Sequence, residues 1–146
     1  MTASHTQDTR ESASDTISAM RQTPFDLIGG HPVIAAIVDR FYDLMDHDAS
    51  YAELRAMHAP DLTPMRASLA GFLAAWAGGP RDWFEGHPGK CMMSIHKNMA
   101  ISRAVADQWA SAMRRAINEA GPSDPLLRRE MGEVLGWMAV GMARPG

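Results

Sequence analysis

The chain has 146 residues, of which 46% are hydrophobic and 21% charged, and its formal net charge is −3. These values predict one soluble globular domain. Lysine and arginine are scattered and form no basic stripe, which argues against nucleic acid as a partner. No run approaches the roughly 18 apolar residues of a membrane helix, and the chain does not begin with a leader pattern. We therefore expect a cytoplasmic protein without membrane contact, and the single Cys91 excludes an intrachain disulfide.

The composition along the chain predicts a tail followed by one domain. Residues 1–22 are rich in Ser, Thr, Asp and Gln and contain few large apolar side chains, so we expect a disordered N-terminal tail. Residues 23–146 form the predicted domain. The chain contains 12 methionines but few valines and isoleucines, and such a flexible, helix-compatible apolar set favours an all-α fold.

The first predicted elements are a short apolar turn at 24–28 and a long helix. The turn ends at Gly29 and Gly30, which permit a sharp corner. Pro32 suits the first turn of the helix that follows. Residues 46–60 lose the helical periodicity and are predicted to form a polar connector that contains turns, whose further structure the pattern does not determine. The apolar face of the long helix consists of Val33, Ile34, Ile37, Val38, Phe41, Leu44 and Met45.

A second long helix is predicted over 64–76, where the Gly-Gly-Pro run at 78–80 ends it. Residues 81–100 then show no sustained periodicity. Loops of that length are uncommon in compact domains and usually serve a site, so we expect functional residues there. The stripe of the second helix consists of Met65, Leu69, Phe72, Leu73 and Trp76.

Two further helices complete the predicted fold. Ser102 is the expected N-cap of a helix over 102–118, and Asp124 with Pro125 begins the last helix. No segment alternates as a strand would, so the sequence predicts four long helices and no sheet. The inner face of the third helix consists of Val105, Trp109, Ala112, Met113, Ala116 and Ile117. The stripe of the fourth consists of Leu127, Met131, Val134, Leu135, Met138 and Met142.

Common catalytic and metal-binding patterns are missing from the sequence. His58, His87 and His96 do not pair at helical spacing with one another or with an acidic residue or thiol, which argues against a zinc site. Ser94 lies close to His96, but no acidic third member or Gly-x-Ser-x-Gly motif accompanies it. An apolar stripe with a single histidine is ordinarily core packing. A helical core with isolated His, Tyr and Trp side chains can also enclose a flat cofactor.

In the order and spacing of its marker residues, the chain resembles the group II truncated haemoglobins, which are globins with four helices packed two over two around haem. The resemblance covers residues 24 to about 143 and implies a truncated globin fold. The thirteen-residue step from His96 to Trp109 matches the family's spacing between the proximal histidine and the pocket tryptophan. The markers are the Gly29-Gly30 corner, Phe41-Tyr42, Leu54 to His58, Phe72-Leu73 before Gly78-Gly79-Pro80, His96 and Trp109.

The resemblance implies a non-covalently bound haem b and assigns roles to individual residues. His96 is the expected proximal ligand of the iron and leaves the opposite axial position open. Tyr42 and Trp109 are the expected hydrogen-bond donors to a bound ligand, and His58 joins the same distal network. Met65 occupies the place where other globins carry a distal histidine. The residues expected to contact the haem also include Phe41, Leu69, Phe72, Met99 and Ile101.

The chain departs from the family around the proximal ligand. The family's usual arginine before the proximal histidine is replaced by Ile95, which leaves Lys90, Lys97 and Arg103 as candidate partners of the haem propionates. His87 is a competing proximal candidate, although its distance from the pocket tryptophan fits badly. Cys91 is a conceivable thiolate ligand, but a buried, inert thiol is the simpler interpretation. Met99 replaces an aromatic neighbour of the haem.

The implied function is binding of dioxygen and other diatomic ligands at a pentacoordinate iron, the property on which oxygen transport depends. Strong donors slow dioxygen release, so we expect a sensor, scavenger or redox role rather than that of a rapid carrier. Nitric oxide dioxygenase and peroxidase-like reactions are candidates, served by an unidentified reductase. The protein would be a monomer or a homodimer. The alternative is a haem-free globin-fold module that binds a protein or another apolar ligand.

Overall fold

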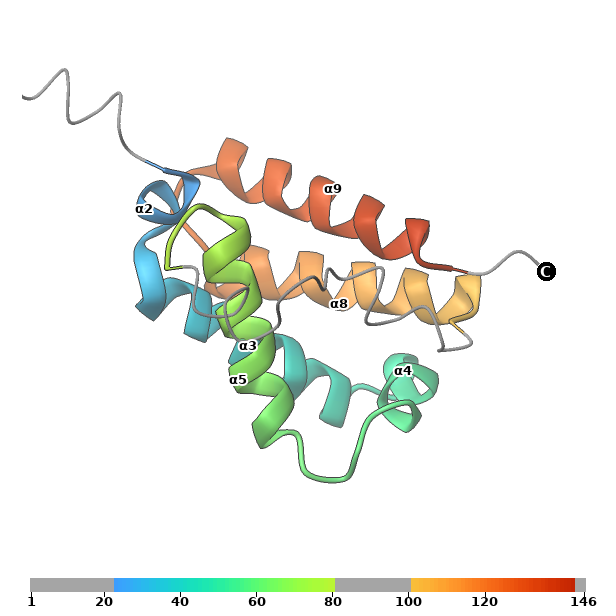
Figure 1. Ribbon diagram of the computed structural model, residues 1–146. Coiled ribbons are helices and arrows are strands. Elements are labelled where there is room, and N and C mark those ends of the chain that lie inside the picture. Colours follow the sequence, from blue (N-terminus) through green and yellow to red (C-terminus); the bar gives the residue numbers. More distant parts are fainter. Residues whose placement is uncertain (1–22, 81–100, 144–146) are drawn as a thin grey trace, which may run out of the picture.

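The computed structural model describes residues 23–80 and 101–143. The predicted tail at 1–22 and the predicted link at 81–100 lie outside these residues. The described part is helical and contains no β-strand, and none of its helices has the length and apolar character required to cross a membrane. It contains the four long helices predicted from the sequence (Figure 1).

A sharp corner joins the first two helices, α2 (Pro24–Ile28) and α3 (Gly30–His47). Gly29 and Gly30 form it with φ angles of 120° and 74°, in the region of backbone space that favours glycine. The predicted corner is therefore confirmed. The buried face of α3 consists of Ile34, Ile37, Val38, Phe41, Tyr42, Leu44 and Met45.

The remaining long helices are α5 (Thr63–Trp76), α8 (Arg103–Ala120) and α9 (Pro125–Gly141). Ser102 caps α8, because its side chain accepts a hydrogen bond from the Val105 N–H at 3.1 Å. The predicted start of this helix is therefore confirmed. Figure 1 shows α8 and α9 side by side and antiparallel, with α3 and α5 as the second pair of helices.

Close packing between α8 and α9 depends on small residues. A Cβ added to Gly136 would lie only 3.4 Å from the Ala110 Cβ, and one added to Gly132 would lie 3.3 Å from the Arg114 side chain.

The apolar stripe predicted for α9 is confirmed at its centre, but Val134 is 44% exposed, so its assignment to the stripe was wrong. Periodicity identifies the middle of an apolar face better than its edge.

The connector at 46–60, whose structure the sequence pattern left undetermined, is ordered. It contains the 3-10 turn η1 (Ala49–Tyr51) and the short helix α4 (Ala52–Ala56). Hydrogen bonds to α8 hold this segment, among them one at 3.0 Å between the Tyr51 hydroxyl and the Ser111 hydroxyl. Such contacts between distant segments leave no local pattern in the sequence, which explains why periodicity missed the order.

An ion pair adds to this attachment. Arg115 Nη1 of α8 donates to Asp48 Oδ2 at 2.7 Å and to the Tyr51 hydroxyl oxygen at 3.2 Å. The hydrogen bond from Arg115 is the main cause that lowers the pKa of Asp48 to about 2. The start of the connector is therefore fixed to α8 by a charged contact over the pH range in which Asp48 stays ionised.

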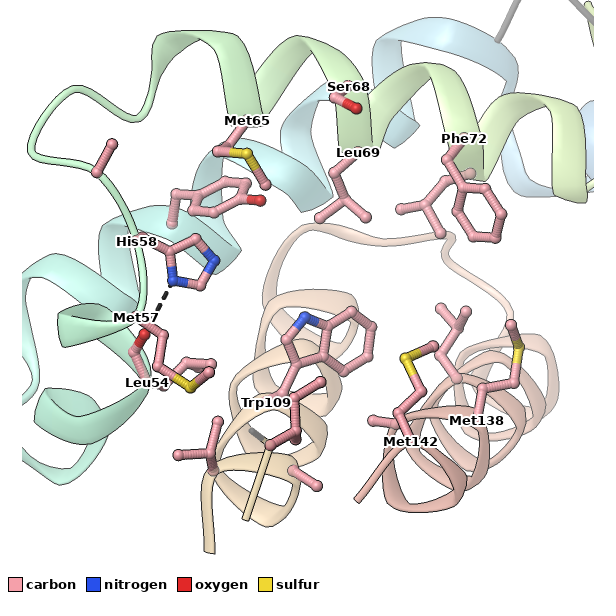
Figure 2. A pocket seen from close by; sticks show the side chains of 18 residues that line it. Leu54, Met57, His58, Met65, Ser68, Leu69, Phe72, Trp109, Met138 and Met142 are labelled. Atoms are coloured by element: carbon pink, nitrogen blue, oxygen red, sulfur yellow. Dashed lines mark hydrogen bonds between the residues drawn. The ribbon is translucent and has the colours of Figure 1, made fainter. Parts of the chain in front are cut away.

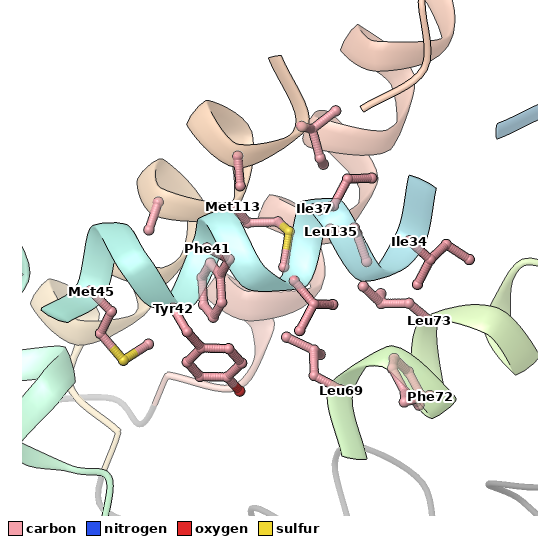
Figure 3. Close-up of a cluster of buried hydrophobic side chains, with 14 of the residues drawn as sticks. Ile34, Ile37, Phe41, Tyr42, Met45, Leu69, Phe72, Leu73, Met113 and Leu135 are labelled. Carbon is pink, nitrogen blue, oxygen red and sulfur yellow. The ribbon is translucent and has the colours of Figure 1, made fainter. Parts of the chain in front are cut away.

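The core lies where α3 crosses α5 and α8. Figure 3 shows Phe41 and Ile37 of α3 together with Leu73 of α5, Met113 of α8 and Leu135 of α9 in one apolar cluster. Each of these side chains is almost completely buried. Burial of such large side chains contributes about 1.5–3 kcal/mol each, so this crossing is a major source of the stability of the described fold.

We expect Gly29→Ala to lower the free energy of unfolding by about 1–3 kcal/mol, because the new Cβ requires a strained positive φ and would lie 2.5 Å from Val33 Cγ2. Gly141→Ala is the matched control, since a Cβ there meets nothing within 4 Å. The control should leave stability unchanged or raise it by up to about 1 kcal/mol. Urea denaturation followed by circular dichroism measures both, and equal stability of Gly29→Ala and the parent chain would contradict the assigned strain.

Candidate functional site

A cavity of about 390 Å³ lies between α4, α5, α8 and α9 (Figure 2). Its size falls within the range of about 300–1,000 Å³ that is typical of cofactor and small-ligand sites. The cavity is lined by Tyr42, Leu54, Met57, His58, Ala59, Met65, Ser68, Leu69, Phe72, Leu73, Ile101, Val105, Ala106, Trp109, Leu135, Met138, Ala139 and Met142.

Most of the cavity wall is apolar and contains several methionines. Met57 and Met65 lie near one end, and Met138 of α9 lies at the other with Met142, which caps the end of that helix (Figure 2). Thioether side chains are flexible and polarizable, so they adapt to an irregular or planar apolar group. The wall therefore suits a large apolar ligand that makes few polar contacts.

Phe41 lies behind the wall and positions two of its polar aromatic residues. Its ring packs edge-on against the Tyr42 ring at 4.9 Å and against the Trp109 ring at 5.3 Å, measured between centroids. Phe41 itself is fully buried and does not line the cavity. It therefore fixes the orientation of its two neighbours from behind rather than contacting a cavity ligand.

The Tyr42 hydroxyl stays protonated well above neutral pH. Burial raises its pKa to about 12, although the positive charge of Arg66 opposes this shift. The ring points from α3 toward α5 near Leu69 (Figure 3). Tyr42 lines the cavity, and its hydroxyl makes no hydrogen bond to another described residue, so its O–H can donate to a molecule in the cavity.

Arg66 of α5 holds the Tyr42 ring from the outer side. Its guanidinium lies 5.6 Å from the ring centroid and donates to Asp39 Oδ1 and to Asp43 Oδ1, each at 3.1 Å. Both carboxylates belong to α3, so Arg66 ties α5 to α3 on either side of Tyr42. Exposed ion pairs contribute little stability, and the effect of this one is mainly positional.

His58 and Trp109 place two more polar atoms at the wall. His58 Nδ1 lies 2.8 Å from the Leu54 carbonyl oxygen, and its ring packs edge-on toward Tyr42 with centroids 6.1 Å apart. The indole N–H of Trp109 has no hydrogen bond to another described residue, and Figure 2 shows its nitrogen directed toward the side of the cavity where His58 lies. Tyr42, His58 and Trp109 therefore border one end of an apolar cavity.

The structure places most of the predicted site residues around this cavity. Ser68 of α5 adds a further hydroxyl to its lining. The predicted residues that line it are Tyr42, His58, Met65, Leu69, Phe72, Ile101 and Trp109. His96, predicted as the proximal ligand, and Met99 lie outside the described residues, as do His87, Cys91, Lys90 and Lys97. Among the residues that the structure describes, no group of three or more His, Cys, Asp and Glu side chains could hold a metal ion.

Several residues that build the site were not singled out from the sequence. Val105, predicted only as part of the inner face of its helix, and Ala106 line the cavity one turn before Trp109, and helical spacing from the tryptophan could have identified both as site residues. The two acidic partners of Arg66 stand four residues apart on α3, which is a weak signal for a shared cation. Gln108, which accepts a hydrogen bond from Leu54 N–H, has no sequence signal at all.

Comparison with known proteins assigns the family. The family model described as bacterial-like globin matches residues 23–143. The chain belongs to the bacterial-like globin family. It is 30% identical over 98 residues to the group 2 truncated hemoglobin YjbI of Bacillus subtilis, an alignment that covers 67% of this chain and 71% of that protein.

Solved structures of truncated haemoglobins share the fold of this bacterial-like globin. The cold-adapted truncated hemoglobin of Pseudoalteromonas haloplanktis TAC125 matches with a TM-score of 0.81 and 30% identity over 86% of this chain and all of that chain. The group II 2-on-2 hemoglobin of Agrobacterium tumefaciens matches with a TM-score of 0.79 and 30% identity, over 84% of this chain and 95% of its own. The predicted family and the all-α two-over-two globin fold are confirmed, and the family implies a haem cofactor.

We expect Tyr42 of this globin to ionise near pH 12, because burial disfavours the phenolate. The ordinary pKa is 10.0, so Tyr42 contributes stability that is fully present below pH 10 and lost as the pH rises toward 12. The difference in tyrosinate absorbance between the parent chain and Tyr42→Phe measures this titration. A difference signal centred at the ordinary tyrosine value would contradict the burial of the hydroxyl.

Proposed function

We propose that the protein binds haem b non-covalently in the cavity and binds dioxygen and other diatomic ligands on it, with His96 as the proximal ligand of a pentacoordinate iron. The proposal combines the family assignment with the histidine that the sequence resemblance selects. The haem iron supplies, when bound, the centre at which a diatomic ligand is taken up. The protein supplies the apolar enclosure and the hydrogen-bond donors.

The observation that carries this proposal is the pair of donors at the wall of an apolar cavity. The Tyr42 hydroxyl and the Trp109 indole N–H have no hydrogen bonds to other described residues. Neither atom is among fully buried polar atoms without a partner in the described part of the chain, so both can donate to a molecule that enters the cavity. A bound diatomic ligand with a partly negative outer atom is a suitable acceptor for both groups.

The cavity also fits the cofactor by its chemistry. Leu69 and Phe72 of α5 lie opposite Met138 of α9 and the adjoining Met142, so apolar side chains face one another across the space (Figure 2). The polar atoms gather at the end bordered by His58. A porphyrin is likewise an extended apolar plane with few polar groups. Arg103 at the start of α8 is a candidate propionate partner among the described residues.

The donor pair supports one class of proposed role. Two donors acting on one small ligand slow its release, which favours a sensor, scavenger or redox role over that of a rapid carrier. Oxidation of nitric oxide and reduction of peroxide are the candidate reactions, with electrons from a reductase that has not been identified. We place the protein in the cytoplasm, as a monomer or homodimer, with residues 1–22 as a tail outside the globin domain.

We expect the purified full chain supplied with hemin to show a Soret absorption band. His96→Ala should abolish or strongly reduce it, because the iron loses its protein ligand, and His87→Ala is the matched control that should retain it. Loss of the band only in His87→Ala would assign the ligand to His87. A parent chain that takes up no hemin would instead support a haem-free module that binds a protein or another apolar ligand.

We expect dioxygen to dissociate from the Tyr42→Phe, Trp109→Phe double variant about tenfold faster or more than from the parent protein. Each lost hydrogen bond is worth about 1 kcal/mol, and about 1.4 kcal/mol corresponds to a factor of ten. Stopped-flow displacement of dioxygen by carbon monoxide measures the rate. Met65→Leu, which changes an apolar lining residue, is the control. An unchanged off-rate in the double variant would refute the donor role.

A further inference from the structure

The hydrogen bond of His58 defines which of its ring nitrogens carries a proton. Nδ1 lies 2.8 Å from the carbonyl oxygen of Leu54. A carbonyl oxygen can only accept, so Nδ1 must be the donor. In the neutral imidazole Nε2 then has no proton and carries a lone pair. Figure 2 shows one nitrogen of the ring on this hydrogen bond and the other facing the interior of the pocket.

The residue whose carbonyl accepts this bond is itself held by α8 through its N–H. Leu54 N–H donates to the Gln108 Oε1 at 3.0 Å in a part-buried contact. This N–H lies in the first turn of α4, where an intrahelical acceptor is missing. One residue therefore uses both backbone groups in a single chain of contacts that runs from Gln108 through Leu54 to His58. Gln108 is also the direct neighbour of Trp109 on α8.

Independent contacts hold the backbone on both sides of His58. The His58 N–H donates to the Arg55 carbonyl oxygen at 3.0 Å. The Arg55 guanidinium donates to the carbonyl oxygens of Ala59 and Pro60, each at 2.9 Å, and forms an ion pair with Asp46. The backbone that carries the imidazole is thus fixed, and the ring is held by its hydrogen bond to Leu54 and its contact with Tyr42.

We propose that Gln108 is a positioning residue that holds His58 in the Nδ1–H tautomer, so that His58 Nε2 is a proton acceptor in the pocket. The pocket then offers one acceptor beside the two donors, Tyr42 and Trp109. The consequence for ligands rests on the proposed haem function, whereas the tautomer does not. Dioxygen and carbon monoxide carry no proton and gain nothing from the acceptor. A small ligand that carries a proton uses all three groups.

Hydrogen peroxide is the ligand class that this arrangement favours. His58 Nε2 takes a proton from one peroxide oxygen: the O–H bond breaks, its electron pair stays on the oxygen as hydroperoxide, and a new N–H bond forms on the imidazole. Tyr42 O–H and Trp109 N–H are then placed to donate to the anionic product. The positive charge on the imidazolium balances the negative charge of the hydroperoxide.

The tautomer is tested by nitrogen-15 NMR of the ring at about pH 9, where an ordinary imidazole is neutral. The full chain is labelled at histidine and studied in its diamagnetic carbonmonoxy form, and a His58→Phe variant assigns the signal among the six histidines. We expect the parent protein to show a protonated Nδ1 and an unprotonated Nε2. A protonated Nε2 would overturn the proposal. If the chain takes up no haem, the haem function fails, but the tautomer is still measured on the haem-free chain.

Variants of Gln108 test its positioning role. Gln108→Leu should give a mixture of tautomers, whereas Gln108→Glu, which keeps an accepting oxygen, should restore the Nδ1–H form. Ser111→Ala is the matched control, because Ser111 holds the same connector through Tyr51 without contacting Leu54. An unchanged tautomer in Gln108→Leu, or an equal change in Ser111→Ala, would assign the effect to general loosening of the connector and overturn the role of Gln108.

A kinetic measurement tests the choice of ligand. The rate constant for reaction of the haem-loaded protein with hydrogen peroxide should fall about tenfold in Gln108→Leu, a size typical of lost support for a site residue. It should recover in Gln108→Glu, and the rate of carbon monoxide binding should stay unchanged in both. Equal losses for peroxide and carbon monoxide would contradict a role in proton acceptance.

Discussion

The crossing of α3 with α5 and α8 is the contact on which the site depends. Phe41 is fully buried at this crossing and packs edge-on against both Tyr42 and Trp109. One side chain of the core therefore sets the orientation of two donors that come from different helices. Stability and function are coupled here, because a change that loosens the core also moves the polar atoms that face the cavity.

Charged contacts outside the core refine this arrangement. Arg66 ties α5 to α3 around Tyr42, and Arg115 ties the connector to α8 through Asp48. Pairs of this kind are partly exposed and contribute little to the free energy of unfolding. Their main effect is positional, because they restrict the movement of the two segments that carry Tyr42 and His58. Ion pairs at the surface therefore help to position the polar residues at this end of the cavity.

The helices could be predicted from the sequence because their signals are local. Ser102 as an N-cap and the Gly29-Gly30 corner each identify a boundary directly. The order of the connector could not be predicted, since it depends on Gln108 and other α8 side chains distant in sequence. Individual site residues were reached through the family resemblance, because neither Tyr42 nor Trp109 differs locally from an ordinary core aromatic. Only the position of Tyr42 and Trp109 at the cavity wall distinguishes them from the other core aromatics.

The methionines of the cavity wall have a consequence for the durability of the protein. Thioether sulfur is readily oxidised to the sulfoxide, and Met57, Met65, Met138 and Met142 all border the space that a reactive ligand would enter. Oxidation there replaces a flexible apolar group with a polar one and makes the enclosure less favourable for an apolar cofactor. Methionine sulfoxide is enzymatically reversible, whereas oxidation of an aromatic donor has no comparable repair. The apolar character of the enclosure therefore depends on the oxidation state of these four methionines.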